Sequence, residues 1–262
     1  MDIVPTLTTR WHLDLCFDGT AYHGWQRQPN ARSVQQTVEE ALSTMLRHDV
    51  AVTGAGRTDT GVHARQMPIH FDTPCALEVS QLVYKLNRLL PHDIAATFAS
   101  PVDNEWHARF SATSRTYHYY VHLGKQPFLR HQSLQLHRPL NMEAMNAAAA
   151  TLLTVSDFGA FCKSGSDVNN TLCHVSEAQW LAIDGQQWYF RITANRFLRN
   201  MVRAVVGTLV DVGRGKTTLQ QFTDIVNGRQ RTQAGDSMPA HALFLEHVGY
   251  DNMTPHTQTS IP

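Results

Sequence analysis

The chain has 262 residues, of which 42% are hydrophobic and 17% charged, a composition typical of a globular protein and not of a disordered one. The formal net charge at pH 7 is zero, so the overall charge does not indicate a nucleic-acid partner. The apolar stretch Ala204–Val210 is too short to span a bilayer, and residues 1–5 lack the basic and apolar regions of a signal peptide. We therefore expect a cytoplasmic protein of one or two domains with no membrane contact.

The N-terminal part of the chain shows the pattern of a strand, a helix, a second strand and a second helix. Apolar residues alternate with polar ones over Trp11–Phe17, which predicts a strand with one buried face. Ser33 begins a capping box, and apolar residues then recur at helical spacing to about Arg47. A glycine-rich loop, a strand and a short helix follow over residues 54–61, 67–71 and 82–90.

The rest of the chain adds strands and two helices. Residues 115–123 alternate, with Tyr117 and Tyr119 on the side opposite His118, which predicts a strand. Apolar residues at a spacing of four predict a long helix over residues 196–212. A helix capped by Asn141 and further strands are expected over residues 147–153, 175–183, 188–194 and 243–248.

This order of elements predicts an α+β fold built from two similar α/β halves. We expect the halves to share a continuous, mostly antiparallel sheet flanked by helices, because no glycine-serine or proline-rich linker divides them. The predicted N-terminal half covers residues 1–104, and the C-terminal half covers residues 105–250. Residues 251–262 are predicted to be a mobile tail.

The cysteines and histidines do not form metal-binding motifs. None of the four cysteines belongs to a C-x-x-C pair, and reduced thiols are expected in the cytoplasm. His118 and His122 are four residues apart, but they lie in a strand pattern, and no carboxylate or cysteine cluster completes a site. The sequence therefore predicts no metal.

Basic residues are concentrated in one segment of this neutral chain. Residues 191–216 contain six of them against the single acidic residue Asp211. Arg196, Arg199 and Arg203 are spaced at i, i+3 and i+7, which predicts that they share one stripe of the long helix. Apolar neighbours indicate that part of this stripe lies close to the core. A surface salt bridge is the simplest structural role for Arg203.

The loop over residues 54–64 is the most unusual run in the chain. Its glycines allow sharp turns and close approach to a ligand, and Arg57 and Asp59 lie at its centre. On spacing alone, a solvated surface loop whose aspartate caps a turn is an equal interpretation. The run is not a dinucleotide fingerprint, because Asp59 occupies the third glycine position. Nor is Gly215-Lys216-Thr217 a phosphate-binding loop, because Val210 stands where its first glycine belongs.

Residues 54–64 resemble the signature of the tRNA pseudouridine synthase A family, whose core reads G-R-T-D-A-G-V-H-A, and only Thr60 departs from it. Three further segments, at residues 17–28, 107–119 and 197–209, resemble family motifs in the same order. The resemblance extends over residues 10–250, which is nearly the whole chain.

The resemblance implies the reaction and its central residues. Members of this family convert uridine to pseudouridine in the anticodon stem-loop of tRNA, typically at positions 38 to 40, without a cofactor or metal. Asp59 would be the catalytic carboxylate, and Arg203 the cation that keeps it charged. Tyr117 would stack on the uracil and serve as the base for the late proton transfer. The sequence leaves open whether Asp59 attacks the base or the sugar, or assists elimination at the sugar.

The resemblance also implies how the substrate is held. Arg57 would enter the space left by the flipped nucleotide, and Leu243 or Leu245 would form an apolar wall of the pocket, although a core strand explains both leucines equally well. A central basic cleft and a homodimer in which one tRNA touches both subunits are expected. The residues expected to contact tRNA are Arg57, His107, Arg109, Phe110, Arg196 and Arg199. The segment Asp167–Thr171 aligns with another tRNA-contacting segment but contains no basic residue.

Two other functions remain open at this point. A catalytically silent tRNA-binding relative would keep the basic helix but lose the carboxylate, and here Asp59 is present. A small-molecule nucleotide enzyme would need a phosphate-binding motif, and none of the glycine-containing runs fits one.

Overall fold

The computed structural model of the chain describes residues 8–163, 165 and 169–251. Residues 1–5, for which no signal peptide is expected, lie outside this range. So do Asp167, Val168 and residues 252–262 of the predicted tail.

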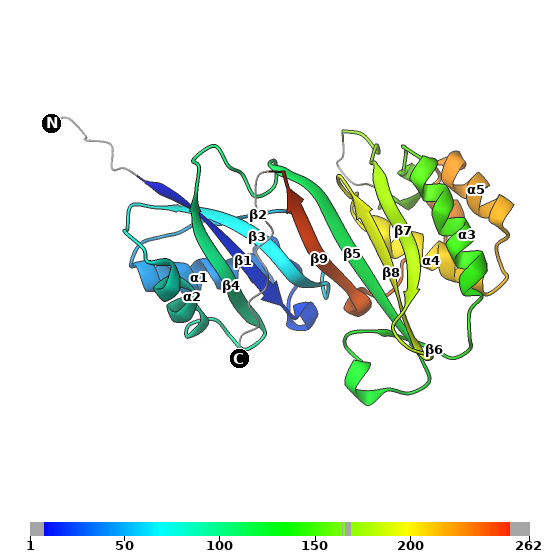
Figure 1. Cartoon of the computed structure of the whole chain (residues 1–262), viewed down its shortest axis with the longest axis horizontal. Helices are drawn as coiled ribbons and strands as arrows, with labels where there is room; N and C mark the ends of the chain where they lie inside the picture. The colour runs from blue at the N-terminus through cyan, green and yellow to red at the C-terminus, as the bar shows by residue number, and fades with distance from the viewer. Residues whose placement is uncertain (1–7, 164, 166–168, 252–262) are drawn as a thin grey trace.

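The described residues contain nine strands that form one open sheet (Figure 1). The strands are β1 (Thr9–Phe17), β2 (Thr53–Gly54), β3 (His63–Thr73), β4 (Ile94–Val102), β5 (Ala112–Leu123), β6 (Leu134–Leu136), β7 (Val175–Ala182), β8 (Gln187–Ala194) and β9 (Leu243–Tyr250). Their order is β4-β1-β3-β9-β5-β8-β7, with β2 beside β3 and β6 beside β5. Neighbours are antiparallel except for the parallel pairs β3–β9 and β5–β6. The prediction of an α+β fold with a mostly antiparallel sheet is confirmed.

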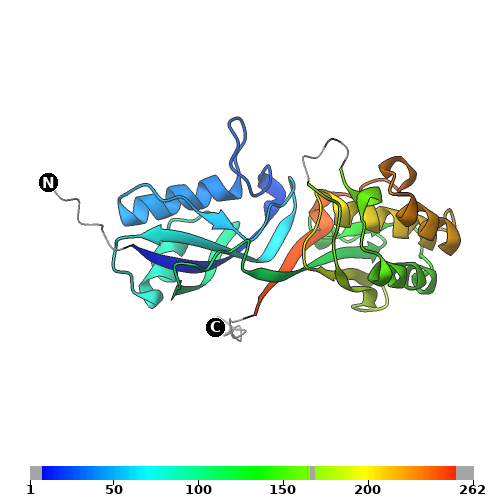
Figure 2. The ribbon, with the colours of Figure 1, turned by 90° about the horizontal axis from the view of Figure 1, so that it is seen from above.

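Five α-helices flank this sheet in the described part of the chain. They are α1 (Val34–Leu46), α2 (Val79–Asn87), α3 (Met142–Thr151), α4 (Met201–Gly213) and α5 (Leu219–Gly228). The first two accompany strands β4, β1 and β3, and the other three accompany β5, β8 and β7 (Figure 1). Seen from above, α1 runs along one side of the N-terminal strands (Figure 2). Ser33 caps α1 by accepting a hydrogen bond from the Gln36 N–H, as its position in the sequence predicts.

The sheet has two hydrophobic cores, and strand β9 contributes to both. Leu245 and Val248 belong to the core under β1 and β3, whereas Leu243 belongs to the core under β5 and β8. Val62, which is early in the chain, packs in this second core. The last strand therefore lies between the N-terminal and C-terminal strands of the sheet and connects them. Neither core is made from one continuous half of the chain. The division at residues 104 and 105 stays a prediction.

The basic helix begins later than the sequence predicts. α4 begins at Met201 and not at Arg196, because Asn200 has a left-handed backbone with a φ of 67°, which the interior of an α-helix does not contain. Arg196 and Arg199 therefore lie in the segment before the helix. The expected stripe of Arg196, Arg199 and Arg203 along one helix is wrong.

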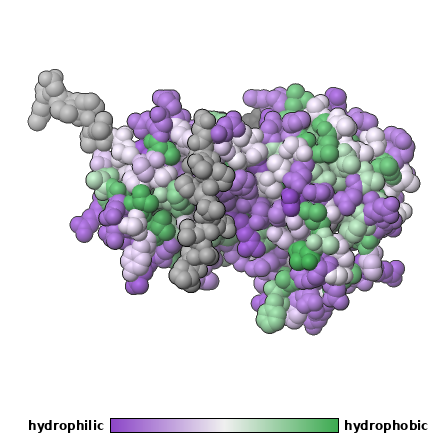
Figure 3. Space-filling model, viewed as in Figure 1, coloured by the Kyte–Doolittle hydropathy of each residue, from purple (hydrophilic) through white to green (hydrophobic). Residues whose placement is uncertain are grey.

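The viewed face of the molecule is mostly hydrophilic, and its hydrophobic residues are scattered (Figure 3). Isolated apolar residues on a surface are normal and do not mark a binding site by themselves. Among the described residues, none of the helices has the length and apolar character needed to cross a membrane.

Candidate active site

The glycine-rich loop before β3 rests on an N-terminal segment that follows β1. The Trp25 N–H donates to the Thr58 carbonyl at 3.3 Å, and the Gly61 N–H donates to the Tyr22 carbonyl at 3.3 Å. Gly24 has a φ of 85°, and a side chain there would collide with the Thr58 carbonyl. Residues 22–25 thus support the loop that carries Asp59, and the close approach of the two backbones requires glycine at position 24.

Asp59 lies at the start of a turn and points toward α4. The Val62 N–H donates to the Asp59 backbone carbonyl at 3.1 Å, which closes the turn. The Asp59 carboxylate is 29% exposed, and its Oδ2 is 3.5 Å from Arg203 Nη1. This distance is at the outer limit of a hydrogen bond, so the pair is an electrostatic contact with little directional bonding. Arg203 is 144 residues further along the chain, so the fold brings the two groups together.

Arg203 is held from behind by the backbone of one segment. Its Nε–H donates to the Met238 carbonyl at 2.6 Å, and the Arg203 carbonyl accepts from the Met238 N–H at 3.1 Å. These two bonds fix the start of the side chain and its Nε, and they leave the guanidinium tip directed at Asp59. No sequence signal marks Met238 for this role, because it acts through backbone atoms.

Tyr117 lies where the two cores meet, close to Asp59. Its ring is half-buried, packs against both cores, and meets the edge of the Phe197 ring at a centroid distance of 5.1 Å. Burial raises the pKa of the Tyr117 hydroxyl above its ordinary value, and the negative charge of Asp59 raises that pKa further. The hydroxyl therefore stays protonated at neutral pH.

The two candidate wall leucines are on β9, beside the tyrosine strand. Leu245 pairs with Tyr117 on one side and with Ala64 of β3 on the other, and Leu243 pairs with Tyr119. Leu245 is 1% exposed and Leu243 is 5% exposed. Both are therefore core residues in this structure, and Leu245 is the one next to Tyr117.

The other predicted tRNA-contacting residues lie outward from this centre. Arg57 is exposed, and its Nε–H donates to the Gln26 side chain at 3.1 Å. Arg109 and Phe110 are exposed at the end of the loop before β5, and the Phe110 ring is 76% exposed. His107 is half-buried and accepts hydrogen bonds from the N–H groups of both residues through Nδ1. Exposed basic and aromatic side chains of this kind suit contact with a nucleic-acid backbone and with unstacked bases.

The remaining two arginines flank Phe197 in the segment before α4. Arg196 is half-buried, and its Nη1 donates to Asn170 Oδ1 at 3.2 Å. Arg199 is exposed, and its backbone carbonyl accepts from the Lys163 N–H. Because Phe197 touches Tyr117, this segment lies beside the candidate centre although it is not helical.

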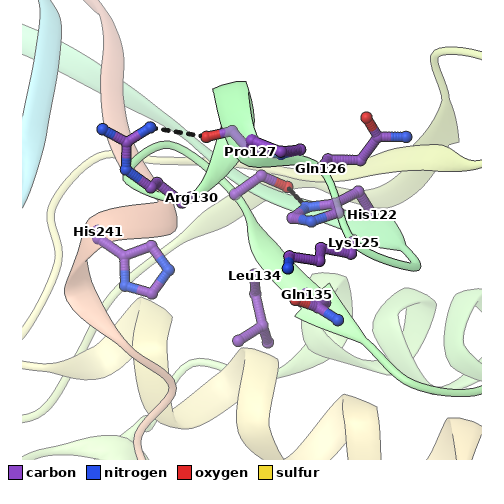
Figure 4. A pocket seen from close by; sticks show the side chains of 9 residues that line it. His122, Lys125, Gln126, Pro127, Arg130, Leu134, Gln135 and His241 are labelled. Atoms are coloured by element: carbon purple, nitrogen blue, oxygen red, sulfur yellow. Dashed lines mark hydrogen bonds between the residues drawn. The ribbon is translucent and has the colours of Figure 1, made fainter.

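A separate hollow of about 380 Å³ lies at the C-terminal end of β5 (Figure 4). Its lining residues are His122, Lys125, Gln126, Pro127, Arg130, Ser133, Leu134, Gln135 and His241. None of the predicted site residues lines it. The hollow is therefore distinct from the group of Asp59, Arg203 and Tyr117, and the central basic cleft stays a prediction.

Arg115 is a further residue that contacts the loop carrying Asp59, and it is not among the site residues predicted from the sequence. Its side chain is on the same side of β5 as Tyr117 and Tyr119, and it donates to the Ala55 carbonyl at 3.1 Å. A charged residue on the buried side of an alternating strand was the available signal. Among the described residues, no group of three or more histidine, cysteine, aspartate or glutamate side chains could hold a metal ion.

The matched family and similar curated proteins indicate the same family. The family described as tRNA pseudouridine synthase matches residues 16–111 and 148–251. A tRNA pseudouridine synthase A of Porphyromonas gingivalis is 52% identical over 92% of this chain and 97% of that protein. The enzyme of the same name from Bacillus subtilis is 39% identical over 91% of this chain and 98% of that protein.

The structural comparison is much weaker. A solved Cbf5-Nop10-Gar1 complex covers 76% of this chain and 54% of the matched chain, with 13% identity and a TM-score of 0.32. The matched family and the sequence relatives are sufficient to assign this chain to a family. This chain belongs to the tRNA pseudouridine synthase family and is an isomerase that forms pseudouridine in tRNA.

Proposed function

We propose that this enzyme modifies the anticodon stem-loop, at tRNA positions 38 to 40, and that Asp59 is its catalytic carboxylate. The observation that carries the proposal is the approach of Asp59 to Arg203 at 3.5 Å beside the half-buried Tyr117. A carboxylate, a cation and an aromatic ring from three different elements are the groups that such a reaction needs. The reaction breaks the N1–C1′ bond of uridine and joins C5 to C1′, and the proton lost from C5 is balanced by one gained at N1.

Each inner residue has a role that follows from its contacts. Arg203 favours the charged form of the Asp59 carboxylate, which faces the reacting nucleotide. Tyr117 offers a flat apolar surface on which the uracil ring can stack, and its hydroxyl can take part in the late proton transfer. Leu245 supports Tyr117 from the neighbouring strand.

The outer residues hold the RNA. A uridine must leave the helical stack to reach Asp59, and this extrusion costs a few kcal/mol. Exposed Arg57, oriented by Gln26, is suited to fill the space that is left. Arg109, Phe110 and Arg199 are suited to contact phosphates and unpaired bases.

Dimerisation would compensate for the modest charge of each chain. The formal net charge of zero gives little general attraction to RNA, so binding has to come from local basic groups. A cytoplasmic homodimer in which one tRNA touches both subunits would bring two such groups to one ligand.

The test is tritium release from carbon 5 of uracil in unmodified tRNA. We expect release that disappears when the uridines at positions 38 to 40 are replaced by cytidine and persists when uridines elsewhere are replaced. Binding without release would instead support a catalytically silent relative. Release from free uridine nucleotides would support a small-molecule enzyme, and release that does not depend on the anticodon arm would overturn the proposed target.

A further inference from the structure

The Arg115 side chain joins three segments that surround the candidate centre. Its Nη1 donates to the Ala112 and Asn195 carbonyls, each at 2.9 Å. Its Nη2 donates to the Ala55 carbonyl at 3.1 Å and to the Arg109 carbonyl at 2.6 Å. Each terminal nitrogen of the guanidinium carries two N–H groups, so all four terminal N–H groups have a backbone acceptor.

The carbonyls that Arg115 contacts come from functionally different parts of the proposed site. Ala55 begins the glycine-rich loop that carries Asp59. Arg109 lies in the loop proposed to contact tRNA, and Asn195 begins the segment that leads through Phe197 to α4. These segments are far apart in the sequence, with 60 residues between Ala55 and Arg115 and 80 between Arg115 and Asn195. One planar side chain therefore contacts both the loop that carries Asp59 and the segments proposed to face the RNA.

The surroundings of Arg115 indicate positioning and not charge pairing. Within the part of the chain that the structure describes, the hydrogen bonds of this guanidinium go to backbone carbonyls. Arg115 is half-buried, and this burial lowers the pKa of its guanidinium from the ordinary value. Arginine tolerates such a position because its guanidinium stays charged and presents its donors in a fixed plane. A lysine has three donors on one flexible ammonium group and cannot satisfy four carbonyls in that plane.

We propose that Arg115 is a positioning residue that aligns the Asp59 loop with the RNA-facing segments, so that the extruded uridine meets the carboxylate in a productive geometry. The proposal rests on the proposed role of Asp59. It assigns no chemical step to Arg115, because its donors are turned to the backbone.

The variant Arg115→Lys tests this proposal, because it keeps the positive charge and removes the planar clamp. We expect the single-turnover rate of pseudouridine formation, measured with saturating enzyme, to fall by about 10- to 100-fold, as misplacement by about 1 Å can cause. The Kd for tRNA and the Tm should stay close to those of the wild type. Hydrogen exchange of residues 54–62 should become faster, since this loop loses one of its anchors.

Arg10→Lys is a matched control. Arg10 also donates to two carbonyls of the loop before β5, those of Asn104 and Trp106, at 2.6 and 3.1 Å. It does not contact Ala55 or Asn195. Loosening the same loop from its other end should leave the single-turnover rate and the exchange of residues 54–62 at their wild-type values.

Three outcomes would overturn the positioning role. The first is a wild-type rate in Arg115→Lys, and the second is a slower rate with unchanged exchange of residues 54–62. The third is a loss of rate that saturating enzyme restores, because Arg115 would then act in tRNA binding. If the wild-type enzyme itself releases no tritium from the anticodon arm, the proposed function fails, and the exchange comparison still decides whether Arg115 holds the loop.

Discussion

Two of the aspartate–arginine pairs in the described part of the chain differ in geometry. Asp72 and Arg10 form two parallel hydrogen bonds of 2.8 Å at the surface, and Arg10 also donates to backbone carbonyls. Their mutual hydrogen bond lowers the pKa of Asp72 and raises the pKa of Arg10. Asp59 and Arg203 share one contact of 3.5 Å, although both are less exposed than Asp72.

This difference separates a structural ion pair from a pair available for chemistry. In the Asp72–Arg10 pair both carboxylate oxygens and the N–H groups that face them are hydrogen-bonded to each other. The pair therefore links β3 to β1, and Arg10 also links β1 to the loop before β5. In the Asp59–Arg203 pair the backbone of Met238 holds the arginine, and the carboxylate keeps bonding capacity for a ligand. Surface pairs contribute little stability, whereas a loosely bonded pair beside an aromatic ring can act on a substrate.

Removing the charge of Asp59 should have the largest effect. Asp59→Asn keeps the shape of the side chain and removes its negative charge, and we expect the turnover rate to fall by about 10⁴-fold. Folding and tRNA binding should remain near the wild-type values, because the one hydrogen bond of the Asp59 side chain in the described part of the chain is the weak contact with Arg203. Tritium release, the tRNA Kd and the Tm measure these three quantities. Activity within tenfold of the wild type would remove Asp59 from the mechanism.

Asp72→Asn is the control for this variant. It should leave turnover unchanged and lower the free energy of unfolding by less than about 1 kcal/mol, because Asp72 is a surface group. Since the pKa of Asp72 is lowered in the folded state, its stabilising effect exists above the ordinary value of 3.8 and is lost as the pH falls through the folded value. The difference in stability from the wild type should therefore disappear in acid.

Tyr117→Phe should have the next largest effect and identify a step. The variant keeps the ring that packs against Phe197 and removes only the hydroxyl, whose pKa is raised by burial and by Asp59. If the hydroxyl takes part in the late proton transfer, we expect tritium release to slow by about 10²-fold. The N1–C1′ bond would still break, so a detached or rearranged base that keeps its tritium should accumulate. Equal slowing of bond cleavage and tritium release would contradict this role and indicate an earlier one.

The sequence predicts much of the fold because local signals and tertiary contacts agree in most elements. The alternation around Tyr117 and the Ser33 cap correspond to β5 and α1 as observed. β4 was not predicted, because its alanine-rich run has no clear alternation, and its partner β1 determines it. α5 was also missed, although Thr218 and Gln221 form a capping box at its start.

The candidate site was predictable as a set of residues but not as a geometry. Arg203 was placed on a helix correctly, but the helix was extended through Asn200, whose left-handed conformation is not visible in apolar spacing. The central position of β9 between β3 and β5 brings Leu245 to Tyr117, and no local pattern contains such a long-range pairing. Arg203 and Arg115 donate to backbone carbonyls, which every residue has. The residue types of their partners therefore give no sequence signal for these contacts, and only the fold determines them.

Arg203→Lys tests the difference between the Asp59–Arg203 and Asp72–Arg10 pairs with a substitution that keeps the positive charge. Lysine keeps the charge near Asp59 but loses the Nε–H that donates to the Met238 carbonyl. We expect the turnover rate to fall by about 10-fold, because the cation remains but its position is less fixed. The same substitution at Arg10 should leave turnover unchanged. Full activity in Arg203→Lys would show that only the charge at this position matters and that the Met238 contact has no role.

The smallest expected effect concerns Arg199, which is exposed and belongs to neither pair. Arg199→Ala should weaken tRNA binding several-fold and reduce the slope of log Kd against log salt by about 1, because one phosphate contact is lost. The single-turnover rate with saturating enzyme should not change. Arg214→Ala is the control, because Arg214 is 44% exposed at the far end of α4 and lies near Asp211. If both variants keep the wild-type slope, Arg199 does not contact phosphate, and the RNA-binding surface must lie on the Arg57 and Arg109 side of the Asp59 loop.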